Sequence, residues 1–337
     1  MTILITGIAG FIGSRFAKWI SENQKDVTII GVDNLEGGFY ENIKDLPIHF
    51  FRCDVSETKA SENNPCPLSW IFETATKSYG QIDYVYHAGA YASEGRSNHI
   101  RSFIQKNNTV GTSNVINECV KHNAHLIFFS SVAVYSGPPP FTEETPPCPI
   151  DEYGLSKYMS EQSIQIAGKT QELKWTIVRP RNVYGSGQNL FDPSRNLMGI
   201  LCYNALNDKP IKIYGDGSNK RAFTHVNDIL EPLWRAKDYD GEIFNIGSKY
   251  FYTVAGAVNA FCSVADYWRV ENIEARHEVP NAWCLTDKSE KMLGYIDTVS
   301  IHDGLTEMWH WAKTQKMRPL MDPPPLETTK NTHPSLL

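Results

Sequence analysis

The chain has 337 residues, of which 41% are hydrophobic and 21% charged, so it can bury the core of one large α/β domain, alone or with a smaller one. Its net charge of −6 argues against a nucleic acid or an anionic membrane as partner, because both select basic surfaces. Seven scattered cysteines without a C-x-x-C pair argue against a disulfide framework and against a metal site, and they favour the reduced cytoplasm.

The first 180 residues alternate between short β-branched runs and amphipathic stretches of helical length. This alternation predicts a doubly wound parallel sheet covered by helices on both faces, in a domain spanning residues 1–180. The expected strands are 2–6, 27–32, 48–53, 82–87, 125–130 and 175–179, and the expected helices are 13–22, 70–78, 101–122 and 152–168.

The regular alternation of strands and helices ends near residue 180, after which helical segments mix with short strands. We expect a smaller mixed α/β substrate lobe over 181–320, from which some elements return to the first domain. Its expected helices are 196–207, 226–236, 253–265 and 301–315, and its expected strands include 211–215 and 242–247. The proline-rich, polar stretch 321–337 is predicted to be a disordered tail.

Three glycines follow the first expected strand at spacings of three: Gly7, Gly10 and Gly13. Glycine permits a tight turn and lets a pyrophosphate approach the N-terminus of the next helix, whose N–H groups and dipole favour anions. Asp33 ends the second strand, where a carboxylate accepts both ribose hydroxyls of NAD and repels the 2′-phosphate of NADP. The pattern therefore favours NAD, although a plain strand–helix turn would use the same glycines.

Tyr153 and Lys157 are four residues apart, which places them on one face of a helix. A neighbouring ammonium lowers the pKa of a phenol and makes it a usable base, and Ser131, at the end of an expected strand, could hydrogen-bond the same substrate atom. A surface tyrosine–lysine pair would show the same spacing, so the pattern alone leaves both interpretations open.

Ten motifs occur in an order that resembles the extended short-chain dehydrogenases/reductases, in the NAD-dependent sugar-nucleotide epimerase/dehydratase group. The resemblance covers residues 2 to about 315 and implies a Rossmann-type fold with NAD as cofactor. The motifs are TGIAGFIGS, VDN, CDV, HAGA, NTVGT, SSVAVYS, YGLSK, RPRNVYGSG, IYGDGSNKRAFTHVND and FNIGS.

The resemblance also implies roles for individual residues. Ser131, Tyr153 and Lys157 match the catalytic triad. The positions that resemble cofactor contacts are Gly7, Gly10, Phe11, Ile12, Gly13, Asp33, Asn34, Asp54, Val55, Ala88, Gly89, Ala90, Tyr91, Asn108, Ser130, Tyr153, Lys157 and Pro180. Those that resemble substrate contacts are Ser131, Asn182, Asn196, Leu197, Tyr214, Arg221, Arg276, Glu278 and Ala282, with Tyr214 on the base and Arg221 on the diphosphate.

Within this family, 4,6-dehydratases carry an Asp–Glu pair directly after the catalytic Ser or Thr, where this chain has Val132 and Ala133. The resemblance therefore favours a UDP-hexose 4-epimerase, with a reductase or a dehydratase as alternatives and a non-catalytic NAD-binding sensor or scaffold as a further one. The small side chain of Ala282 would extend the substrates to N-acetylhexosamines. Family members usually form homodimers, here through 101–122 and 152–168.

Overall fold

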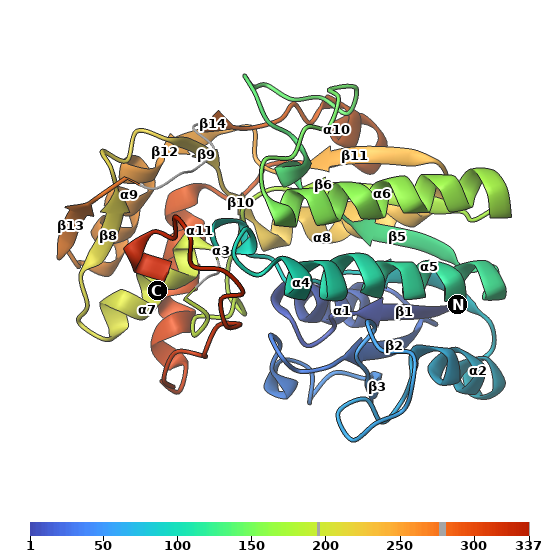
Figure 1. The fold of residues 1–337 in the computed structure, drawn as a ribbon. Coiled ribbons are helices and arrows are strands. Elements are labelled where there is room, and N and C mark those ends of the chain that lie inside the picture. Colours follow the sequence, from blue (N-terminus) through green and yellow to red (C-terminus); the bar gives the residue numbers. More distant parts are fainter. Residues whose placement is uncertain (194–195, 276–280, 337) are drawn as a thin grey trace.

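The computed structural model describes residues 1–193, 196–275 and 281–336 and shows two lobes side by side (Figure 1). A seven-stranded sheet forms the centre of the larger lobe, and all its neighbouring strands are parallel. The spatial order is β3 (His49–Arg52), β2 (Thr28–Asp33), β1 (Thr2–Thr6), β4 (Ile82–His87), β5 (His125–Phe129), β6 (Trp175–Pro180) and β11 (Glu242–Ile246). The doubly wound parallel sheet is confirmed, with the strand order of a dinucleotide-binding fold.

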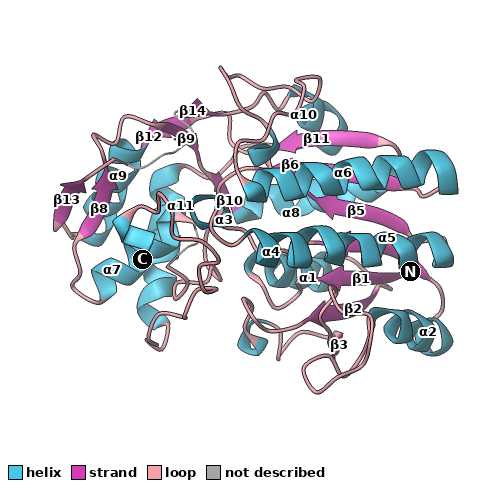
Figure 2. Ribbon diagram, viewed as in Figure 1, coloured by secondary structure: helices cyan, strands magenta, loops and turns pink. Residues whose placement is uncertain are grey.

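Helices cover both faces of this sheet (Figure 2). Successive side chains of β1 point to opposite faces, so Ile3 and Ile5 join one buried cluster and Leu4 joins the other. Burying each such side chain contributes about 1.5–3 kcal/mol. The first face is covered by α1 (Phe11–Asn23) and α8 (Val226–Arg235), and the second by α2 (Leu68–Tyr79), α5 (Gly111–His122) and α6 (Glu152–Gln171).

The segment expected as one helix over 101–122 has three parts. It begins as α4 (Arg101–Ile104), widens into a π-helical stretch, η2 (Gln105–Val110), and continues as α5. A π-helical turn inside a longer helix rotates the side chains on either side of it and is common at functional sites. Here it carries Asn108 toward the inside of the molecule, where its side chain is 1% exposed.

The smaller lobe packs α7 (Leu197–Leu206), α9 (Val254–Ala265) and α11 (Ile301–Thr314) around its own apolar core. Its strands form three small sheets. The strands are β7 (Val183–Tyr184), β8 (Ile211–Tyr214), β9 (Lys220–Ala222), β10 (Thr224–His225), β12 (Phe251–Thr253), β13 (Val270–Ile273) and β14 (Asn281–Ala282). The shorter helical elements are α3 (Glu94–Ser97), α10 (Asp287–Leu293), η1 (Tyr40–Asn42), η3 (Val132–Val134), η4 (Ala236–Asp238) and η5 (Pro334–Leu336).

The C-terminal segment lies against both lobes. The backbone N–H of Met321 donates to the carbonyl oxygen of Phe191 in the smaller lobe, and Arg96 of α3 donates to the carbonyl oxygen of Pro324. The sequence analysis predicted a disordered tail from the composition of this segment. Composition cannot reveal these backbone contacts, because they involve residues far away in the chain. None of the helices in the described ranges combines the length and apolar character that crossing a bilayer requires.

Candidate active site

A cleft of about 730 Å³ lies where the carboxyl ends of the central strands face the smaller lobe. Ligands of doubly wound sheets bind at this edge, beside the point where the strand order reverses between β1 and β4. The predicted site residues that line the cleft are Gly7, Gly10, Phe11, Ile12, Gly13, Asp33, Asn34, Asp54, Val55, Ala88, Gly89, Ala90, Tyr91, Ser130, Ser131, Tyr153, Lys157, Pro180, Asn182, Asn196, Leu197, Tyr214 and Arg221.

Four predicted site residues are not in this set. Asn108 and Ala282 are described by the structure but do not line the cleft. Arg276 and Glu278 fall outside the described residues.

The glycine turn leaves space that a side chain would close. Gly7 has φ +69°, and a Cβ there would stand 2.7 Å from the backbone of Gly89. A Cβ on Gly13 would stand 2.2 Å from the carbonyl oxygen of Gly7, so the start of α1 can lie this close only without one. Gly38, which the sequence analysis missed, likewise packs without a Cβ against Ala9 and Gly10. The cradle fits a dinucleotide pyrophosphate held at a helix N-terminus.

Asp33 links the glycine turn to the end of β2. One carboxylate oxygen accepts from the backbone N–H of Ala9 at 3.0 Å and the other from Leu35 at 2.8 Å. Burial raises the pKa of Asp33, and these backbone donors oppose that shift. Each oxygen keeps a second lone pair for a ribose hydroxyl, which fits NAD.

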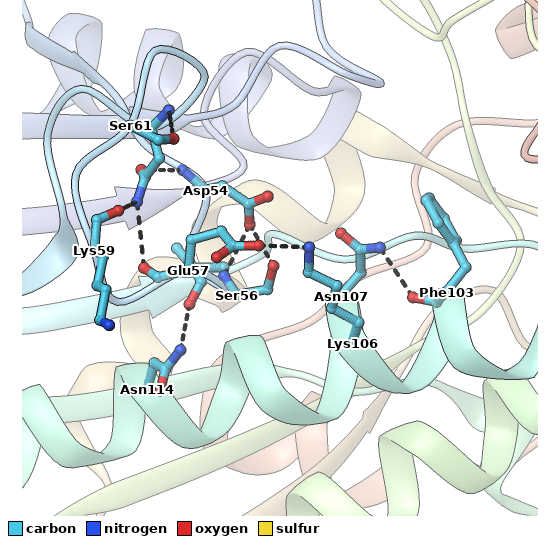
Figure 3. A network of polar contacts seen from close by, with 11 residues as sticks. Asp54, Ser56, Glu57, Lys59, Ser61, Phe103, Lys106, Asn107 and Asn114 are labelled. Atoms are coloured by element: carbon cyan, nitrogen blue, oxygen red, sulfur yellow. Dashed lines mark hydrogen bonds and ion pairs between the residues drawn. The ribbon is translucent and has the colours of Figure 1, made fainter.

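The loop after Asp54 is folded around a buried amide and tied to the long helix (Figure 3). The side chain of Asn64 accepts from the backbone N–H of Asp54 and donates to the carbonyl oxygens of Glu57 and Lys59. Glu57 pairs with Lys106 of η2 at 2.5 Å, as the close-up shows. The loop therefore holds Asp54 and Val55 at the cleft in a fixed position; sequence spacing alone does not reveal Asn64 as its centre.

The proposed catalytic side chains line the cleft where α6 begins beside η3. The Ser131 hydroxyl accepts from the backbone N–H of Ala133 at 3.1 Å, which caps η3. A Cβ on Gly154 would stand 2.2 Å from the carbonyl oxygen of Ala133, so the helix reaches this turn because residue 154 is glycine. Tyr153, in the first turn of α6, is brought with Ser131 into the same cleft.

Lys157 follows one helical turn after Tyr153 and is 4% exposed. Its ammonium donates to the carbonyl oxygen of Phe129 at 2.7 Å. Burial lowers the pKa of Lys157 to about 7, against the opposing effect of the Glu161 carboxylate. At that pKa, the side chain can give up or take a proton near neutral pH.

A buried ion pair lies one turn further along α6. Glu161 is bound by Arg179 of β6 through two hydrogen bonds, Nε–Oε1 at 2.8 Å and Nη2–Oε2 at 2.5 Å, and it also accepts from the Ser130 hydroxyl. Both charged side chains are nearly inaccessible to solvent. Each charge therefore depends on the opposite charge of its partner to compensate for its lost hydration. The pair joins α6 to β5 and β6 next to Lys157, and the sequence analysis did not identify it.

Asn108 acts as a spacer between backbone segments rather than as part of the cleft wall. Its carbonyl oxygen accepts from the backbone N–H of Tyr91 at 2.8 Å, and its amide nitrogen donates to Tyr91 and to the Ser156 hydroxyl. These bonds fix the loop after β4 against α6. The cofactor contact of Asn108 stays a prediction; the structure shows its side chain buried in the π-helical stretch and positioning this loop.

The predicted substrate residues come from several elements of the smaller lobe. Tyr214 ends β8, and Arg221 lies in the middle of β9. The Asn182 amide donates to the carbonyl oxygen of Ala222, while Asn196 caps α7 by accepting from Met198. Ala282 pairs with Arg221 in the neighbouring strand, and its side chain is away from the cleft lining.

No group of three metal-ligating side chains occurs among the residues that the structure describes. The cleft holds the dinucleotide cradle and the polar side chains of Ser131, Tyr153 and Lys157.

Residues 3–247 match the model of the NAD dependent epimerase/dehydratase family. The chain is 28% identical over 322 residues to a putative UDP-glucose 4-epimerase of Methanocaldococcus jannaschii, covering 92% of this chain and 98% of that protein. It is also 28% identical to the UDP-glucose 4-epimerase of Pasteurella multocida, covering 93% and 98%.

Solved structures are also similar to this chain in fold. The fold is similar to UDP-glucose 4-epimerase of Thermotoga maritima with UDP-glucose, with a TM-score of 0.83, 26% identity, and 93% and 99% of the two chains covered. It is also similar to the Thermus thermophilus UDP-glucose 4-epimerase complex with NAD, with a TM-score of 0.82, 25% identity, and 93% and 99% covered.

Proposed function

The chain belongs to the NAD-dependent epimerase/dehydratase family, and from this premise we propose that it is a nucleotide-sugar 4-epimerase acting on a UDP-hexose. NAD is the cofactor of the family. UDP is proposed from the names of the relatives and from a cleft that offers an aromatic, Tyr214, and a cation, Arg221, at its smaller-lobe end.

The turn that follows Ser131 favours epimerisation over dehydration. The residues after Ser131 form the tight turn η3, in which Val132 and Val134 are buried and Ala133 has only a methyl group. Removing water from a sugar needs an acid and a base beside the reacting carbons, and this turn supplies neither. The later acid Glu143 is not in the cleft, since its carboxylate accepts from the backbone N–H of Asn245 at 2.7 Å.

The mechanism assigns a separate task to each polar side chain. NAD, held by the glycine turn and Asp33, would supply the hydride-transfer chemistry at C4 of the sugar. Tyr153, as a phenolate, takes the proton of the C4 hydroxyl and later gives it back. The Ser131 hydroxyl donates to the same oxygen and stabilises the developing carbonyl.

Lys157 acts next to the tyrosine rather than on the sugar. Its buried ammonium lies one turn along the same helix, and a neighbouring positive charge favours phenolate over phenol. The glycine turn with Asp33, and the loop at Asp54, would hold the two ends of NAD. Arg221 and Tyr214 would hold the nucleotide so that the oxidised sugar can turn while the rest of the substrate stays bound.

We propose that the substrate carries a plain hexose rather than an N-acetylhexosamine. An acetylated sugar would need the space that the small side chain of Ala282 leaves, and this residue does not line the cleft. A nucleotide-sugar reductase uses the same three catalytic side chains and is the second candidate. A sensor or scaffold that binds NAD without turnover would not need Ser131, Tyr153 and Lys157 in one cleft.

The test is direct. Purified protein is incubated with UDP-galactose, and UDP-glucose is measured with a coupled dehydrogenase and by NMR. We expect conversion without added cofactor and one retained NAD per chain. Consumption of added NADPH with release of a reduced sugar would instead identify a reductase, and no turnover of any nucleotide sugar would favour a sensor.

We also propose a homodimer in the cytoplasm. Leu155, Met159 and Ile166 of α6 are 37%, 43% and 59% exposed, and they are separated by four and then seven residues. At 3.6 residues per turn this spacing brings them to one face. The helix α6 runs beside the α4–η2–α5 segment on one side of the sheet (Figure 1), and Val110 of η2 adds a further exposed apolar side chain. Two copies of this pair would bury the stripe in a four-helix bundle.

A further inference from the structure

The C-terminal segment is anchored at the rim of the cleft by contacts that precede its last turn. The Glu327 carboxylate accepts from the backbone N–H groups of Ser102 and Phe103, each at 2.9 Å, at the start of α4. The backbone N–H of Glu327 donates to the carbonyl oxygen of His99, and Thr332 is hydrogen-bonded to the ring of the same histidine. Figure 1 shows the segment in red on the smaller-lobe side of the gap, beside α3.

These anchors bring His333 into the nucleotide end of the cleft. His333 lines the cleft together with Tyr214 and Arg221. Its ring lies 5.5 Å from that of Tyr214 at an interplanar angle of 75°, an edge-to-face arrangement. The imidazole and the phenol ring therefore lie in contact at the nucleotide end of the cleft.

The protonation of the ring follows from its neighbours. Nδ1 of His333 lies 2.9 Å from the hydroxyl of Ser335, which can donate or accept, and 3.2 Å from the backbone N of the same serine, whose N–H can only donate. Nδ1 is therefore an acceptor, so the neutral ring carries its proton on Nε2. Nε2 is buried and has no hydrogen-bond partner among the described residues. A buried donor without an acceptor is costly unless a ligand supplies one.

We infer that His333 is a substrate-binding residue whose Nε2–H donates to a carbonyl oxygen of a pyrimidine base stacked on Tyr214, so that the C-terminal segment forms one wall of the nucleotide subsite. This inference rests on the proposed function, because it takes the substrate to be a UDP-sugar. Uracil suits the donor because its ring edge presents two carbonyl oxygens.

The experiment measures UDP binding to the NAD-loaded, full-length protein by calorimetry. His333→Ala removes the ring, and His333→Phe keeps an aromatic ring but removes the donor. We expect both variants to bind UDP about fivefold to tenfold more weakly, the factor that one neutral hydrogen bond contributes. The KM for the UDP-sugar should rise by a similar factor, while kcat stays close to the wild-type value. His302→Ala, an exposed histidine of α11, is the matched control.

Inorganic pyrophosphate, which has no base, should inhibit all these proteins equally. UDP affinity that is unchanged in both variants, or increased because the segment had blocked the site, overturns the inference and leaves the epimerase proposal intact. A loss in His333→Ala but not in His333→Phe would overturn the donor role, because ring packing alone would explain the loss. A wild-type protein that binds UDP-sugars with no measurable affinity overturns the proposed function and this inference with it.

Discussion

Lys157 shows how the burial of one side chain sets the chemistry of the cleft. An ammonium removed from water loses solvation, which is why the pKa of Lys157 falls to about 7. The carbonyl oxygen of Phe129 and the nearby Glu161 carboxylate compensate part of that loss. Lys157 therefore brings to the cleft it shares with Tyr153 a positive charge that changes near neutral pH.

Tyr153→Phe tests the proposed base. We expect the variant to fold and to retain NAD but to lose about 10²–10⁴-fold in turnover, the usual contribution of a positioned acid–base group. Turnover is measured with the coupled UDP-galactose assay. The control is Tyr158→Phe, the same change one residue beyond Lys157 and outside the cleft lining. Turnover near the wild-type level in Tyr153→Phe would show that another group moves the proton.

Arg221→Ala tests the diphosphate end. Arg221 lines the cleft from β9, and a charge-assisted hydrogen bond to a phosphate contributes about 1.5–3 kcal/mol, or roughly tenfold to a hundredfold in affinity. We expect UDP to bind that much more weakly while NAD content is unchanged. Arg269→Ala, on the solvent side of the smaller lobe, should bind UDP like the wild type. If calorimetry gives one affinity for all three proteins, Arg221 does not bind the phosphates.

Single residues were predictable where a motif fixes a backbone shape or a helical spacing. The glycine turn, Asp33, and the trio of Ser131, Tyr153 and Lys157 all lie at the cleft as expected. His333 was not predictable, because it reaches the cleft only through contacts of residues 321–332 with other parts of the chain. The resemblance places Asn108 at the cofactor, whereas the sequence pattern does not reveal the π-helical stretch in which its side chain is buried.

At the scale of elements, periodicity located the long helices to within a few residues. The helix expected over 152–168 spans Glu152–Gln171, and the one expected over 301–315 spans Ile301–Thr314. Strands of two or three residues, such as β9 and β14, were not predicted, since a period of two cannot be read from so short a run. These strands nevertheless hold Arg221 at the cleft.

The exposed stripe of α6 gives a prediction that belongs to this scale. Replacing Met159 or Ile166 by Glu places a carboxylate in the proposed four-helix interface, where it would be buried without a partner. We expect each variant to sediment as a monomer under conditions in which the wild type is a dimer. Ile296→Glu, at an exposed apolar residue on another part of the surface, is the control and should leave the dimer intact.

Analytical ultracentrifugation over a range of protein concentrations distinguishes the two states. Two results would contradict the proposed interface: a wild type that remains monomeric at every concentration, or α6 variants that remain dimeric. Tyr153 begins the same helix on its buried side, so circular dichroism and NAD content should be checked to confirm that α6 itself is unchanged.

At the scale of the whole molecule, the sequence predicted two lobes divided near residue 180 with some elements returning to the first, but not which elements return. Strand β11 follows much of the smaller lobe in sequence yet pairs with β6, and α8 packs beside α1. The alternating pattern of a strand tells which residues face a core but not which sheet the strand joins. The larger lobe therefore closes only after residues 242–246 return to it, which ties the two lobes together.

Glu307 lies at this junction and predicts how stability depends on pH. Its carboxylate is 3.1 Å from Nε2 of the buried His225, and Gly304, one turn earlier in α11, has no Cβ to keep the helix away from that histidine. The contact with His225 lowers the pKa of Glu307 to about 2, and burial opposes this shift. Ser186, and Arg15 in α1 of the larger lobe, lower it further.

The folded pKa is below the ordinary value of 4.5, so the unfolded chain binds the proton more readily than the folded one. The stabilisation is therefore complete above about pH 4.5 and is lost as the pH falls toward 2. We expect Glu307→Gln to lower the melting temperature at pH 7, and the difference from the wild type to shrink between pH 5 and pH 3. Glu271→Gln, whose carboxylate is 3.9 Å from Lys212 on the surface, should show no such trend. A melting-temperature difference that stays constant across this range would mean that the Glu307 charge does not stabilise the junction.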